Sequence, residues 1–154
     1  MVQDLIDCEA RASSDPCWAP TELNEAWRIN SNGATHRPGG PHSKDGYACT
    51  FWKDLGWFRF TGDAGTRLQN TCPRLGSCGT QIPYWTDATM PEKVKEVVTI
   101  TVYGSERRYN KPDKCKLNPR PLEVMRCSNR TQFDFIYRVP SDYTEFCSSA
   151  FCSM

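Results

Sequence analysis

The sequence has no run of 18 apolar residues, so it contains no segment long enough to cross a membrane as an apolar helix. It also lacks an excess of charge of either sign, because 19 basic residues nearly balance 18 acidic ones. A formal net charge of +1 produces no general electrostatic field that would attract nucleic acid. We therefore expect a chain of 154 residues with no direct membrane span and no nucleic-acid partner.

The residues and motifs of catalysis are equally scarce. The two histidines, His36 and His42, both lie in a Gly/Pro-rich stretch that predicts a loop, a poor support for preorganised chemistry. There is no Gly-x-Ser-x-Gly, no phosphate-binding loop and no His-Glu-x-x-His. We expect no enzyme, no catalytic residue and no cofactor. A secreted hydrolase or thiol enzyme is the less favoured alternative.

Cysteine is the residue type that the chain has in excess. No Cys-x-x-Cys occurs among the nine cysteines, and structural zinc sites usually need such tight pairs, often with histidine. The spacing therefore favours disulfides over a bound metal, and disulfides are typical of extracellular proteins. We expect four bridges among eight of the cysteines: Cys17, Cys49, Cys72, Cys78, Cys115, Cys127, Cys147 and Cys152.

The first residues have neither the basic region nor the apolar core of a signal peptide. Because a disulfide-bonded chain must still be exported, we expect this sequence to be part of a longer secreted or cell-surface protein. Residues 1–14 are predicted to be an N-terminal extension, and residues 15–152 to be a single domain. Cys8 lies in the extension and is expected to pair outside the domain or to stay free.

Alternating polarity predicts a strand from Trp57 onward, inside the most aromatic stretch of the chain. Trp57, Arg59 and Thr61 fall on one face, and Phe58 and Phe60 fall on the other. Aromatic side chains bury large areas, so we expect this strand to be the centre of the core. Trp57 is expected to be a core residue, so Trp57→Ala should prevent folding or secretion. Because Arg59 shares its face, the alternative is that Phe58 and Phe60 face the core.

Further elements follow from composition. Residues 94–103 are rich in β-branched side chains and predict a strand. Residues 122–127 and 133–139 predict a hairpin around a polar connection, and residues 21–28 predict a short helical turn capped by Thr21. The expected fold is a small disulfide-rich β protein with twisted antiparallel strands, a C-terminal hairpin, long loops and at most short helices.

Two surface features are candidates for binding. Asn129-Arg130-Thr131 is an acceptor sequence for N-glycosylation, placed in the polar connection of the predicted hairpin. Residues 105–120 form a basic connector that would suit a heparin-like polyanion, although its prolines and acids make a solvated loop the favoured interpretation. The candidate polyanion-binding residues are Arg107, Arg108, Lys111, Lys114, Lys116 and Arg120.

A set of motifs matches a known family: Leu23-Asn-Glu-Ala-Trp27-Arg28, Gly46-Tyr-Ala-Cys49, Gly56-Trp-Phe-Arg-Phe-Thr-Gly62-Asp-Ala-Gly65-Thr-Arg67-Leu, Thr71-Cys72, Cys78-Gly-Thr and Pro83-Tyr-Trp85. The sequence thereby resembles the eight-cysteine domain of the family of uromodulin, zymogen-granule membrane glycoprotein 2 and the liver-specific zona-pellucida-type protein. This resemblance implies a non-enzymatic extracellular module of a mosaic glycoprotein, which presents surface and an N-glycan to extracellular or lectin-like partners.

The sequence departs from that family in two places. Uromodulin-like members have an extra cysteine pair in the region that matches residues 94–114, and the absence of both here leaves eight cysteines to pair with one another. Some members also have a glycan after the tryptophan that matches Trp85, but Asp87 replaces the asparagine. The expected connectivity, chosen because it fastens both ends of the chain to the central strands, is Cys17–Cys127, Cys49–Cys147, Cys72–Cys152 and Cys78–Cys115.

Overall fold

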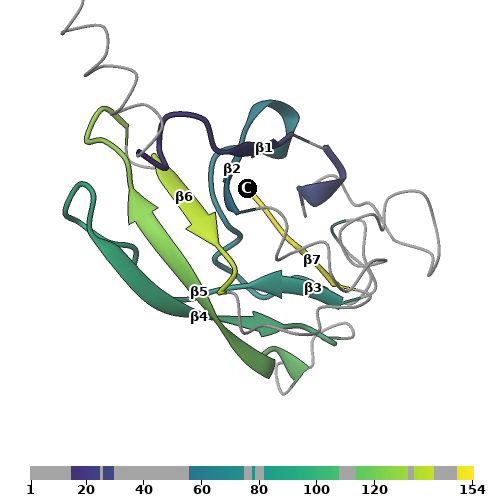
Figure 1. Cartoon of the computed structure of the whole chain (residues 1–154). Helices are drawn as coiled ribbons and strands as arrows, with labels where there is room; N and C mark the ends of the chain where they lie inside the picture. Colours follow the sequence, from purple (N-terminus) through teal and green to yellow (C-terminus); the bar gives the residue numbers. More distant parts are fainter. Residues whose placement is uncertain are drawn as a thin grey trace, which may run out of the picture.

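The structure is a computed structural model of the chain (Figure 1). It describes residues 15–24, 26–29, 56–74, 78, 82–107, 114–131, 134–140 and 149–154. The strands are β1 (Thr21–Leu23), β2 (Trp57–Phe60), β3 (Ile82–Trp85), β4 (Val97–Gly104), β5 (Leu117–Arg126), β6 (Phe135–Arg138) and β7 (Ser149–Phe151). In the described ranges the helical residues form 3₁₀ turns, η1 (Ala26–Arg28) and η3 (Gly62–Ala64).

The strands form one seven-stranded sheet in the order β1-β2-β6-β5-β4-β3-β7. Its middle is antiparallel, with β4, β5 and β6 as consecutive neighbours, and its two edge strands, β1 and β7, are added in parallel. The predicted fold class is confirmed, including the hairpin of β5 and β6. The parallel edges were not expected, because each of them joins segments that are far apart in the sequence.

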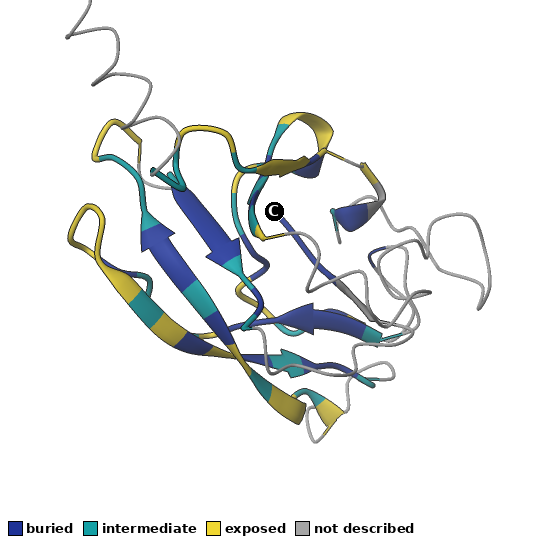
Figure 2. Ribbon diagram, viewed as in Figure 1, coloured by how far each residue is buried: buried dark blue, intermediate teal, exposed yellow. Residues whose placement is uncertain are grey.

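The sheet curves until its two edges meet. Ile29, which follows η1, forms a parallel bridge with Ser153, which follows β7, and the Ser153 N–H donates to the Arg28 carbonyl at 2.9 Å. The same closure brings Phe58 of β2 against Phe151 of β7, with 5.5 Å between the ring centroids. Many of the buried residues lie along the strands of this curved sheet, where Figure 2 colours them dark blue.

The centre of the core is a group of stacked aromatic rings. Phe58, Phe60 and Tyr137 lie 5.5 to 5.9 Å from one another, and Phe58 is fully buried. Trp57 points to the opposite face of β2, where it is half-buried beneath the guanidinium of Arg138, 4.5 Å from its ring. The core residues of β2 are therefore Phe58 and Phe60, and the expectation that placed Trp57 in the core is wrong.

Two other predicted elements need correction. Residues 21–28 do not form one helical turn, because Thr21–Leu23 pairs with Phe58–Phe60 as a parallel strand and only Ala26–Arg28 is helical. The strand predicted at 94–103 is present as β4, but it begins at Val97, and Val94 forms only an isolated bridge with Arg126. Within β4, Ile100 and Val102 are buried.

The C-terminal residue is held by the segment that follows η3. The carbonyl of Met154 accepts hydrogen bonds from the N–H groups of Thr66 and Arg67 at 3.0 and 3.2 Å, and the Met154 N–H donates to the Arg67 carbonyl at 2.8 Å. Gly65 makes this approach possible, because a Cβ there would lie 2.6 Å from the Met154 carbonyl oxygen. Its φ of +81° is also one that side chains rarely adopt.

We therefore expect Gly65→Ala to lower the free energy of unfolding by about 3 kcal/mol, from backbone strain together with the forced displacement of Met154. Gly56→Ala is the matched control, since Gly56 has a similar φ of +61° but no atom within 4 Å of the place that a Cβ would take. That variant should lose only about 1–2 kcal/mol. Urea denaturation of both variants gives the comparison, and equal losses would contradict a role for the Met154 contact.

Candidate functional site

The connection between β5 and β6 carries the glycosylation sequence. Asn129, Arg130 and Thr131 are exposed, and this connection is the yellow turn between the two strands in Figure 2. Its base is closed by the Cys127 N–H, which donates to the Asp134 carbonyl at 2.8 Å. The loop thus places the Asn129 side chain in solvent at the end of the central hairpin.

Polar contacts fix the shape of this connection. Ser128 Oγ donates to the carboxylate of Asp134 and accepts from the Arg130 N–H at 3.3 Å. The other carboxylate oxygen of Asp134 lies 2.9 Å from a guanidinium nitrogen of Arg59 on β2. The connection is therefore tied to the neighbouring strand β2, and not only to its own hairpin.

A disulfide adds a covalent attachment at the same place. Cys127, which directly follows β5, is bonded to Cys17, with a Cα–Cα distance of 5.8 Å and a sequence separation of 110. This is the pairing expected from the sequence. It fastens the N-terminal segment of the domain to the base of the loop that carries Asn129.

The two other disulfides differ from the expected connectivity, because Cys72 pairs with Cys115 and Cys78 pairs with Cys152. Cys72 lies against Ser105, whose hydroxyl donates to the Pro73 carbonyl, and the pairing of β4 with β5 brings residue 115 to the same end of the sheet. The expected bonds Cys72–Cys152 and Cys78–Cys115 are therefore wrong.

Cys8, Cys49 and Cys147 lie outside the described residues, so the expected Cys49–Cys147 bond stays a prediction.

The basic connector is partly neutralised by the protein itself. Lys116 Nζ lies 2.7 Å from a carboxylate oxygen of Asp87 and 5.1 Å from the centroid of the Tyr103 ring. The hydrogen bond to Asp87 raises the pKa of Lys116, so this ammonium stays charged and paired at neutral pH. Arg120 hydrogen-bonds to the hydroxyl of Tyr84. Arg107 and Lys114 are also described, whereas Arg108 and Lys111 lie outside the described residues.

Asp87 therefore has a structural partner at the position where some family members are expected to have a glycan. Next to it, Trp85 donates from its indole nitrogen to the Cys115 carbonyl at 2.7 Å, and its ring lies 5.9 Å from that of Tyr103. Nothing in the sequence pattern indicated the Asp87–Lys116 pair, because the two residues come from segments that flank different strands.

The described part of the chain contains no cluster of metal-binding side chains. Within it, no group of three or more His, Cys, Asp or Glu side chains is arranged to hold a metal ion. His36 and His42 lie outside it. None of the helical segments described is long and apolar enough to cross a membrane.

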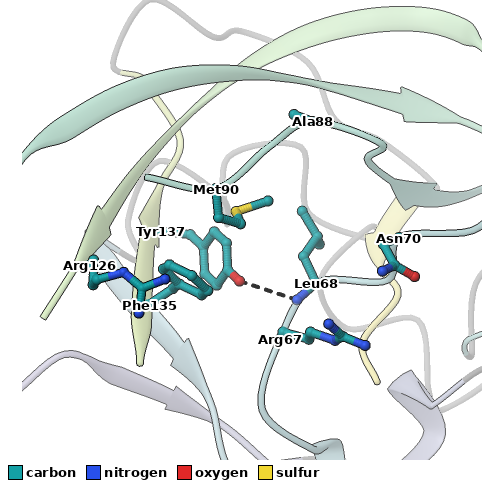
Figure 3. Close-up of a pocket in the computed structure, with 8 residues that line it drawn as sticks. All are labelled: Arg67, Leu68, Asn70, Ala88, Met90, Arg126, Phe135 and Tyr137. Carbon is teal, nitrogen blue, oxygen red and sulfur yellow. Dashed lines mark hydrogen bonds between the residues drawn. The ribbon is translucent and has the colours of Figure 1, made fainter. Parts of the chain in front are cut away.

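One feature that sequence reasoning missed is a pocket of about 270 Å³ (Figure 3). Its walls come from the segment after η3, from the irregular chain after β3, and from β5 and β6. Because these segments are distant in sequence, no local motif could have indicated the pocket. The lining residues are Arg67, Leu68, Asn70, Ala88, Met90, Arg126, Phe135 and Tyr137.

Comparisons with known proteins indicate the family of this chain. A family model described as the uromodulin-like D8C domain matches residues 58–153. Rat uromodulin is 30% identical over 129 residues, which cover 79% of this chain and 17% of that protein. The rat pancreatic secretory granule membrane major glycoprotein GP2 is 25% identical over 154 residues, or 96% of this chain and 26% of that protein.

The human pancreatic secretory granule membrane major glycoprotein GP2 is 34% identical over 93 residues, which cover 56% of this chain and 15% of that protein. The chain thus spans about a quarter or less of the length of these relatives. The matched family region contains β3 to β7, all but the first residue of β2, and two of the three described disulfides in full. The chain belongs to the uromodulin-like D8C domain family.

Proposed function

We propose that this chain is a non-enzymatic extracellular module of a larger secreted or cell-surface glycoprotein, and that it presents an N-glycan on Asn129 to carbohydrate-binding proteins. The observation that carries the proposal is the position of Asn129, exposed at the end of the central hairpin within an Asn-Arg-Thr sequence. Two of the relatives are named as a glycoprotein of the secretory granule membrane, which supports an exported and glycosylated parent protein.

The surroundings of Asn129 suit presentation of a sugar. Its side chain is exposed, so a glycan there displaces no core residue. The base of its loop is fixed by the Cys17–Cys127 disulfide and by the contacts of Asp134 with Ser128 and Arg59. A glycan attached to a loop held in this way keeps a defined direction relative to the sheet, which lowers the entropic cost of its recognition by a partner.

The glycan is expected to be present when the chain is expressed in a secreting eukaryotic cell. Digestion with an N-glycosidase should shift the secreted wild-type protein on a gel, and Asn129→Gln should abolish that shift. Thr131→Ala should abolish it too, whereas Thr131→Ser retains the acceptor sequence and serves as the matched control. Wild-type protein that does not shift, or a shift that survives in Asn129→Gln, would refute the proposed attachment site.

Recognition of the sugar needs a second measurement. Immobilised wild-type protein should bind a mannose- or galactose-specific lectin, and Asn129→Gln should not, while both proteins show the same unfolding midpoint. Equal binding of the two proteins would show that the lectin contacts the polypeptide and would contradict glycan presentation.

Polyanion binding through residues 107–120 is the less supported alternative. Lys116 is paired with Asp87 and Arg120 with Tyr84, so these two cations would have to exchange a protein partner for the polyanion. The proposed function therefore rests on the glycan site and not on the basic connector.

A further inference from the structure

Three large apolar side chains are exposed in the described part of the chain, and they come from segments that meet at the Cys17–Cys127 disulfide. Trp18 is 67% exposed, Val97 44% and Val94 39%. Single exposed apolar residues are common and need no explanation, whereas several at one place mark a contact surface. We call Trp18, Val94 and Val97 the disulfide patch.

The disulfide and the strand pairing bring the members of this patch together. Trp18 directly follows Cys17, whose Sγ lies 3.8 Å from the Sδ of Met125. Met125 is in turn the cross-strand partner of Val97. Val94 forms a bridge with the last residue of β5. The patch therefore joins the N-terminal segment of the domain to the end of the β4–β5 pair.

The backbone at Trp18 is held in a turn. Its N–H donates to the Asp15 carbonyl at 3.0 Å, and the Asp15 carboxylate lies 2.8 Å from Lys95 Nζ. The indole has no hydrogen bond or ring contact with the described residues, so a flat apolar ring faces solvent from a fixed backbone. The ion pair that holds the turn has no net charge, so it favours no charged ligand.

Asn129 is attached to the same disulfide. The Cα atoms of Cys17 and Cys127 are 5.8 Å apart, and Figure 1 shows the start of the described chain and the connection between β5 and β6 at one end of the sheet. Trp18 is one residue from Cys17, and Asn129 is two residues from Cys127. At about 3.8 Å for each residue, the Cα atoms of Trp18 and Asn129 are at most about 17 Å apart. Both side chains are exposed.

We propose that the Trp18 ring binds the two core N-acetylglucosamine residues of a glycan on Asn129, an inference that rests on the proposed function. A pyranose ring has C–H groups on one face and hydroxyl groups at its edge, so the apolar face can pack on an indole while the hydroxyls stay in water. Val94 and Val97 extend the apolar surface beside that ring. Sugar and indole belong to one molecule, so even a weak contact is well populated. The outer branches then point in a fixed direction and remain open to a carbohydrate-binding partner.

The test is a double-mutant cycle on the secreted glycoprotein, followed by its thermal unfolding midpoint. Asn129→Gln removes the glycan, and loss of a contact as strong as an aromatic pair should lower the midpoint by about 2–4 °C. In the Trp18→Ala background, Asn129→Gln should leave the midpoint unchanged, because the contact is already absent. Trp18→Phe keeps an aromatic ring and is the matched control, in which Asn129→Gln should still lower the midpoint.

A direct readout comes from NMR of the glycosylated wild-type protein. Nuclear Overhauser effects should connect the Trp18 indole protons with C–H protons of the first two sugar residues. Their absence would overturn the contact even if the midpoints behave as expected.

The outcomes separate this inference from the proposed function. A wild-type protein that N-glycosidase does not shift on a gel refutes both. If the protein is shifted but Asn129→Gln has the same effect with and without Trp18, the glycan site stands and only the contact with Trp18 is refuted. Wild-type protein that forms a dimer in gel filtration, with Trp18→Ala monomeric, would show that a second copy covers the patch in place of the glycan.

Discussion

Replacing Phe58 by alanine is expected to lower the free energy of unfolding by about 3–5 kcal/mol, which is the usual cost of deleting a fully buried aromatic side chain. Phe58 is 0% exposed and its ring lies 5.7 Å from that of Tyr137 and 5.5 Å from that of Phe151. These contacts join β2 to β6 and to the opposite edge of the sheet. A cavity at this point would therefore weaken the closure of the sheet as well as its centre.

Trp57→Ala is the matched comparison, because it removes a larger side chain from the neighbouring position of the same strand. Trp57 is half-buried, and its ring lies beneath the guanidinium of Arg138 at 4.5 Å. Loss of this contact and of partial burial should cost about 1–2 kcal/mol. Denaturant titration under non-reducing conditions measures both variants. A larger loss for Trp57→Ala than for Phe58→Ala would mean that the two faces of β2 have been assigned the wrong way round.

The case of β2 shows what can be predicted from the sequence. Alternation separates Trp57 and Arg59 from Phe58 and Phe60, and the structure has these two faces as predicted. The pattern does not say which face is buried, because both carry aromatic side chains. Which face of β2 is buried depends on its register with β6, which places Phe58 beside Tyr137. No short stretch of sequence indicates the register between two strands that are distant in the chain.

The disulfides illustrate the same limit. Spacing predicted bridges in place of a metal site, and six of the cysteines are bonded in the described part of the chain. Of the three described bonds, Cys17–Cys127 is the one that was predicted correctly, and the expected partners of Cys72 and Cys78 were exchanged. Their pairing follows from how β7 and residue 152 pack beside β3, where the Cys152 N–H donates to the Tyr84 carbonyl at 3.0 Å. This contact joins segments that are distant in the sequence, and the spacing of cysteines contains no information about it.

The two candidate sites, the Asn129 sequence and the pocket, also differ in how far the sequence alone indicates them. The Asn129 sequence is a local motif, and its place in a hairpin connection followed from the two flanking strands. The pocket depends on Leu68, Met90 and Tyr137, which meet only after three separate segments have packed. Sequence motifs therefore indicate candidate modification sites more readily than they indicate pockets.

Removal of the Cys17–Cys127 disulfide is the second change with a large expected effect. The bond closes a loop with a sequence separation of 110, and in the chain-entropy description a loop of this length contributes about 4–5 kcal/mol. Cys17→Ala/Cys127→Ala should therefore lower the unfolding free energy by about 4 kcal/mol, with the other disulfides intact.

The matched control is Lys95→Ala, which removes a second long-range attachment of the same N-terminal segment. Lys95 Nζ lies 2.8 Å from the carboxylate of Asp15, but both side chains are substantially exposed, so this pair should contribute about 1 kcal/mol or less. Denaturant titration compares the two variants. Equal losses would show that the disulfide stabilises the domain no more than the ion pair does, and would contradict the contribution expected from closing so long a loop.

The same disulfide variant also tests how firmly the connection that contains Asn129 is held. Without the bond to Cys17, the base of the Asn129 connection keeps only its hydrogen bonds and the Arg59–Asp134 ion pair. Amide hydrogen exchange should therefore become faster at residues 127–131 in the variant, while exchange in β4 changes only as much as the loss of global stability requires. If exchange at 127–131 rises no more than that in β4, the disulfide stabilises the domain as a whole and has no special role in fixing the Asn129 connection.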